Sequence, residues 1–112
     1  MRLLIIIVIS LSLSNIVKAE KLTVYTYDSF VSEWGPGPII EEKFEDKYNI
    51  DLEFIAVDGA ATLLNKIILE GEKSNADIVL GLDMNLFAAA NKSNLFTDHS
   101  LDKINEEIQV PV

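Results

Sequence analysis

The 112-residue sequence contains no cysteine, a single histidine, and nine basic residues against eighteen acidic ones. The absence of cysteine excludes disulfide bonds, a thiol nucleophile and, in an exported chain, a lipid-modified amino-terminal cysteine. The acidic excess gives a formal net charge of −9 at pH 7, which repels phosphate backbones and anionic lipid surfaces. The composition therefore argues against nucleic-acid and membrane-surface partners and favours a cationic one.

Catalytic motifs are also missing. His99 lies in a polar stretch typical of solvent-exposed side chains, and no serine occupies the turn of a nucleophile elbow. The "GPGP" run at residues 35–38 matches neither a dinucleotide-binding pattern nor a phosphate loop, and its prolines remove donors that a phosphate would need. We therefore expect no enzymatic activity, no metal and no cofactor. The alternative from another class is a secreted α/β enzyme that acts on a cationic substrate with aspartates as general bases.

The sequence has one long apolar run, at its amino terminus. The first two residues carry a positive charge, residues 3–13 are almost entirely apolar, and Val17 and Ala19 supply the small residues of a cleavage site. The run is shorter than the roughly 20 residues that a membrane-spanning helix needs. We predict a signal peptide at residues 1–19, cleaved after Ala19, and a mature domain at 20–112. Cleavage removes two basic residues, which changes the net charge to 7 − 18 = −11.

The remaining sequence alternates between strand and helix patterns. Its strand segments are rich in β-branched and aromatic residues, and its helical segments repeat apolar residues every three to four positions. The last strand segment is almost continuously apolar, as is typical of a parallel strand covered on both faces. The βαβαβα order predicts an α/β fold with a parallel sheet and helices packed on it. In chain order we predict a strand at 21–27, a helix at about 38–48, a strand at 51–57, a helix around 63–68 that ends at Gly71, a strand at 77–82, a short helix at 84–91 and another near 101–108.

Each predicted strand is followed by an aspartate, namely Asp28, Asp58 and Asp83. Ligands of parallel sheets bind beyond the carboxyl ends of the strands, where these three carboxylates would gather if the strands are neighbours. For Asp58 and Asp83, which directly precede predicted helices, the alternative is that the side chain caps the helix. Asp28 lies far from the next predicted helix, so capping is a weaker explanation there.

Aromatic residues surround the same predicted edge of the sheet. Strand alternation places Tyr25 and Tyr27 on one face, and Phe30 and Trp34 follow in the next loop. Aromatic rings beside carboxylates suit a flat organic cation, which they would hold by stacking and cation–π attraction. The alternative, that the rings only cover the core, is weaker for Tyr27 and Trp34 than for the other two.

Three stretches together resemble a known family. The signal peptide, "LTVYTYDSFVSEWGPGP" at 22–38 and "LLNKIILEGEKSNADIVLGLD" at 63–83 are similar to the amino-terminal part of the periplasmic thiamine-binding proteins of ABC transporters. The resemblance implies an α/β, periplasmic-binding-protein-like (type II) lobe, with a mostly parallel sheet flanked by helices and the second lobe absent from this chain. It further implies a monomeric periplasmic protein that captures thiamine or its phosphate esters and delivers it to the transporter permease.

The resemblance also implies where the ligand would bind. The expected ligand contacts are Tyr27, Asp58, Gly59 and Ala60, with Trp34 and Asp83 in supporting positions. An alternative within the same fold is a binding protein for another cation, ferric iron or a polyamine, held by the three strand-end aspartates.

Overall fold

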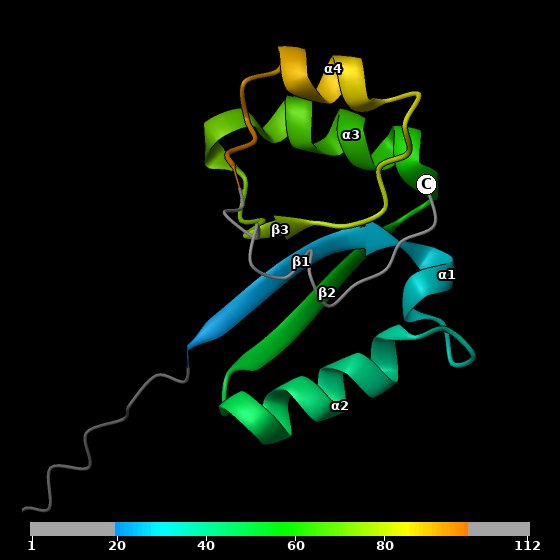
Figure 1. Cartoon of the computed structure of the whole chain (residues 1–112), viewed down its shortest axis with the longest axis vertical. Coiled ribbons are helices and arrows are strands. Elements are labelled where there is room, and N and C mark those ends of the chain that lie inside the picture. The colour runs from blue at the N-terminus through cyan, green and yellow to red at the C-terminus, as the bar shows by residue number, and fades with distance from the viewer. Residues whose placement is uncertain (1–19, 99–112) are drawn as a thin grey trace, which may run out of the picture.

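The computed structural model describes residues 20–98. The predicted signal peptide, His99 and the helix expected near 101–108 lie outside these residues. Figure 1 shows strands enclosed between helices. The elements are β1 (Lys21–Tyr27), α1 (Asp28–Val31), α2 (Gly37–Tyr48), β2 (Asp51–Val57), α3 (Gly59–Glu70), the single 3-10 turn η1 (Gly71–Lys73), β3 (Ile78–Val79) and α4 (Phe87–Lys92).

The three described strands form one parallel sheet in the order β2-β1-β3. Pairing between β1 and β2 is complete, from Lys21 opposite Asp51 to Tyr27 opposite Val57. These two strands therefore end level with each other, and the loops that follow them leave the same edge of the sheet. The predicted α/β fold with a parallel sheet is confirmed.

The third strand is shorter than predicted, since β3 comprises Ile78–Val79 where the sequence indicates 77–82. It pairs with β1 alone among the described strands. The Leu80 amide still donates to a β1 carbonyl at 2.9 Å, but Gly81, with a φ of 107°, then turns the chain away from strand geometry. An apolar run thus predicts a strand, whereas the glycine within it sets the length.

The segment between β1 and α2 contains a helical turn, α1, where the sequence suggests a loop. Phe30 packs edge-to-face against Tyr27, with 5.9 Å between ring centroids, and against Phe54 of β2, with 5.5 Å. These contacts fix the turn on the sheet. The following glycines, Gly35 and Gly37, lie so close to backbone of α1 that a Cβ atom on either would crowd the Phe30 carbonyl oxygen. The "GPGP" run therefore serves close packing and the start of α2.

Helices cover both faces of the sheet, with α3 and α4 on one side and α2 on the other (Figure 1). On the α3 side, Tyr25 is buried with Leu63 and Ile67. On the α2 side, Val24 lines an apolar groove together with Phe44 of α2. The predicted alternation of β1 is thus confirmed for these residues. No helix within residues 20–98 combines the length and the apolar character needed to cross a membrane.

Candidate ligand-binding site

A hollow of about 350 Å³ opens at the carboxyl edge of the sheet. Its walls come from three separate places in the chain: the end of β1, the start of α3 and the segment after β3. Since β1 and β2 end level and α3 starts directly after β2, the fold itself brings these segments together. The lining residues are Tyr27, Gly59, Ala60, Gly81, Leu82 and Asp83.

Tyr27 and Tyr25 lie on the same face of β1 but in different surroundings. Tyr25 is only 3% exposed and packs beneath α3, so the core-packing alternative describes it correctly. Tyr27 is half-buried at the end of the strand and borders the hollow. The aromatic wall of the hollow is therefore a single ring, with Phe30 packed beside it and not lining the hollow.

Gly59 and Ala60 form the first turn of α3. The first backbone N–H groups of a helix have no partner within the helix, so this turn offers donors at the wall of the hollow. Asp58 occupies the N-cap position, but its side chain makes no capping hydrogen bond. Capping therefore does not account for Asp58, which is exposed next to the hollow and does not line it.

Asp83 differs from Asp58 in this respect. Its Oδ1 accepts hydrogen bonds from the backbone N–H groups of Asn85, at 2.8 Å, and Leu86, at 3.2 Å. These bonds form turns at 84–86 that delay the start of α4 to Phe87, three residues later than predicted. Asp83 thus organises the turn before α4 but does not cap the helix, because the N-cap of α4 is Leu86 and it has no side-chain capping bond. The same residue places a carboxylate at the rim of the hollow.

Two other predicted positions do not line the hollow. Trp34 sits in the loop between α1 and α2 with 82% of its surface exposed, and it does not line the hollow. Asp28 begins α1 and is exposed. Within residues 20–98 no group of three or more His, Cys, Asp or Glu side chains is arranged to hold a metal ion. The three strand-end aspartates therefore do not converge on one point.

Gly81 and Leu82 line the hollow although sequence reasoning did not select them. A signal was present, because a lone glycine inside a strand-like run often marks a close approach to the backbone. In the structure that approach is made by the ring of Tyr27.

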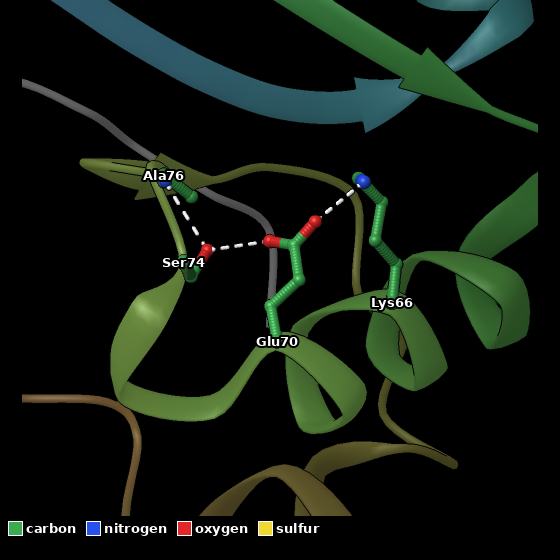
Figure 2. A network of polar contacts seen from close by, with 4 residues as sticks. All are labelled: Lys66, Glu70, Ser74 and Ala76. Carbon is green, nitrogen blue, oxygen red and sulfur yellow. Dashed lines mark hydrogen bonds and ion pairs between the residues drawn. The ribbon is translucent and has the colours of Figure 1, made fainter.

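The opposite end of α3 is held by a polar network (Figure 2). Lys66 Nζ lies 2.6 Å from Glu70 Oε1, and the hydroxyl of Ser74 donates to Glu70 Oε2 at 2.9 Å. The backbone N–H of Ala76 in turn donates to Ser74 Oγ at 3.2 Å. The hydrogen bond from Lys66 lowers the pKa of Glu70, and the hydroxyls of Ser74 and Tyr25 lower it further. Glu70 in turn raises the pKa of Lys66. The network joins α3 to the segment that leads into β3.

Comparison with known proteins gives a consistent result. No family model matches the chain. The sequence is 49% identical over 89 residues to the thiamine-binding periplasmic protein of Brucella abortus, covering 80% of this chain and 27% of that protein. It is 52% identical over 75 residues to the thiamine-binding periplasmic protein of Escherichia coli K12, covering 67% of this chain and 23% of that protein.

A solved structure of a periplasmic thiamin binding protein superimposes with a TM-score of 0.75 at 44% identity, covering 83% of this chain and 29% of that one. The chain is a homologue of the periplasmic thiamine-binding proteins. It spans about 27% of the length of the Brucella relative. The expected periplasmic-binding-protein fold is confirmed for the described residues, which form part of one lobe of a thiamine-binding-protein homologue.

Proposed function

We propose that this chain forms part of a periplasmic solute-binding protein that captures thiamine or its phosphate esters and delivers it to an ABC transporter permease. The observation that carries the proposal is the hollow at the carboxyl edge of the sheet. It gathers Tyr27, Gly59, Ala60 and Asp83 from three segments of a chain homologous to proteins named for thiamine binding.

The chemistry of the hollow suits thiamine, which is flat, aromatic and cationic. The Tyr27 ring offers a stacking surface and a cation–π partner. The carboxylates of Asp83 at the rim and Asp58 beside it supply negative charge, and the first turn of α3 supplies backbone N–H donors. The ring therefore matches the flat aromatic shape of the ligand, and the carboxylates match its positive charge.

We further propose that residues 1–19 are a signal peptide cleaved after Ala19 and that residues 20–112 form the first lobe. A second lobe would supply the opposite wall of the site. The ligand would then bridge two lobes and shift an open–closed equilibrium, and the permease would bind the closed form. The protein would act as a monomer, without catalysis and without a cofactor.

A thiamine titration tests the proposal on this chain. With one wall of the site present, we expect weak, saturable binding in the millimolar range, seen as shifts of the amide signals of Gly59, Ala60 and Asp83 in ¹H–¹⁵N spectra. Replacing Asp58 by Asn removes a neighbouring charge and should weaken thiamine binding by about 2- to 5-fold. Asp46→Asn, an equal change of charge on the exposed surface of α2, should have no effect.

Two results would contradict the proposed thiamine site, and a third would contradict the need for a second lobe. Equal effects of the two Asn variants would show that the charge beside the hollow has no special role. Saturable shifts with spermidine but none with thiamine would favour a polyamine ligand. A tight one-to-one complex in calorimetry would instead show that this chain needs no second wall.

A further inference from the structure

Gly81 lies directly against the ring of Tyr27. It follows β3 and has a φ of 107°, a backbone conformation that residues with a side chain rarely adopt. A Cβ atom built on Gly81 would overlap both Cδ1 and Cε1 of Tyr27. The ring therefore occupies the space that any side chain at position 81 would fill.

A second contact fixes the same ring. Phe30 meets Tyr27 edge-to-face, with 5.9 Å between centroids and 70° between ring planes. Phe30 is itself supported by Phe54 of β2 at 5.5 Å. Tyr27 is thus held by the sheet through Phe30 and by the chain after β3 through Gly81, while it still borders the hollow.

We infer that Gly81 is a positioning residue for ligand binding, because its missing side chain leaves the space that sets the orientation of the Tyr27 ring. This inference rests on the proposed function, since it assumes that the ligand stacks on Tyr27. Stacking energy depends on ring geometry, and a ring held in place before binding loses less freedom when the ligand arrives. Gly81 would then affect the ligand without touching it through a side chain.

The test begins with Gly81→Ala and a matched control, Gly71→Ala. Gly71 also has a positive φ, 56°, but a Cβ atom there meets nothing within 4 Å. Both variants therefore strain the backbone, and only Gly81→Ala displaces a ring. In ¹H NMR spectra of the full chain without ligand, we expect the Tyr27 ring signals and their contacts to Phe30 to change in Gly81→Ala alone.

The thiamine dissociation constant provides the second measurement. Gly81→Ala should raise it roughly 2- to 10-fold, the range expected for loss of one aromatic contact. In a Tyr27→Ala background the same substitution should have almost no further effect, because the two changes act through one ring. The inference would be overturned if Gly81→Ala lowered affinity equally in the wild-type and Tyr27→Ala backgrounds. It would also be overturned if Gly81→Ala left the affinity of the wild-type background unchanged.

Folding of the variant is a test in its own right. If Gly81→Ala unfolds the chain through ring overlap, adding Tyr27→Ala restores folding, and persistent unfolding of the double variant would contradict the inference. Failure of the proposed function has a different result: the wild-type chain then shows no saturable response to thiamine. If the Tyr27 ring signals are unchanged in Gly81→Ala, the inference is overturned regardless of the thiamine affinity.

Discussion

Thr26 lies between the two tyrosines of β1, and it is the most unusual buried residue among those described. Its side chain has no exposed surface, and its hydroxyl oxygen has no hydrogen-bond partner within residues 20–98. Burying a hydroxyl without a partner costs free energy because the bonds it made to water are not replaced. This cost lies one residue before Tyr27, at the end of the strand that forms the hollow.

Replacing Thr26 by Val should therefore raise the free energy of unfolding, by about 1 kcal/mol. Valine keeps the branched shape that suits a strand and removes only the unpaired polar atom. Chemical denaturation measures the change, with Thr62→Val on the exposed surface of α3 as a control that should change little. A loss of stability in Thr26→Val would show that the hydroxyl has a partner, such as a buried water.

The same strand shows how far single residues can be interpreted from sequence. Alternation correctly predicts that Tyr25 and Tyr27 share a face, because strand geometry alone decides it. It does not predict that α3 buries one ring and leaves the other at the hollow, since that depends on where the helix crosses the strand. Trp34 shows the same limit, because its residue type suggests an aromatic wall for the ligand, whereas 82% of its surface is exposed and it does not line the hollow.

At the scale of elements, α3 connects the hollow to the polar network. Its first turn lines the hollow, and its last turn carries Glu70, which binds Lys66 and Ser74 (Figure 2). The network holds the end of the helix to the chain entering β3, whose continuation includes Gly81. The stability of this joint therefore bears on the geometry of two walls of the hollow.

The polar network around Glu70 should make the stability of the fold depend on pH. The pKa of Glu70 is lowered from 4.5, mainly by Lys66, so its contribution is complete above pH 4.5 and is lost as pH falls through the folded-state pKa. The pKa of Lys66 is raised from 10.5, mainly by Glu70, so its contribution is lost as pH rises through a value above 10.5. Glu70→Gln should lower the melting temperature at neutral pH, and this difference should shrink in acid.

Melting temperatures of wild type and Glu70→Gln at neutral pH and well below pH 4.5 test this expectation. Glu72→Gln is the matched control, because it removes an exposed acidic charge two residues away in η1. The control should follow the wild-type pH dependence. If both variants lose the same stability at neutral pH, general charge and not the Lys66 contact is responsible.

Elements differ in how well the sequence predicts them. The patterns for β1, β2 and α2 are long and regular, and their bounds agree with the structure to within one residue. The short elements depend on contacts from outside themselves: α1 on the packing of Phe30, the end of β3 on Gly81, and the start of α4 on the hydrogen bonds of Asp83. Of the residues that line the hollow, the sequence pattern points to Tyr27, Gly59, Ala60 and Asp83, whereas the approach of Gly81 to Tyr27 required the three-dimensional structure.

At the scale of the whole molecule, the α2 side of the sheet carries an open groove of about 190 Å³ lined only by apolar side chains. Two residues at its β3 edge are markedly exposed, Ile78 at 45% and Leu80 at 37%. Exposed apolar surface favours association, while the net charge of −9 opposes the approach of a second copy. The balance between these two effects decides the state of the chain in solution.

This balance predicts that association depends on salt and pH. At neutral pH and low ionic strength we expect a monomer, because like-charged copies repel each other. Added salt screens that repulsion beyond about 10 Å at 0.1 M, and lowering the pH towards the sequence pI of about 4.4 removes the charge itself. Sedimentation velocity should show larger species appearing under either condition.

Two variants distinguish the contribution of the groove to association from that of the other exposed apolar residues. Leu80→Asp places a charge inside the groove and should shift association to higher salt. Leu69→Asp adds the same charge on α3, where Leu69 is 86% exposed and lies outside the groove, and should change association much less. Equal shifts in both variants would mean that net charge alone controls association, and a wild-type chain that stays monomeric at high salt would show that the groove does not attract a second copy.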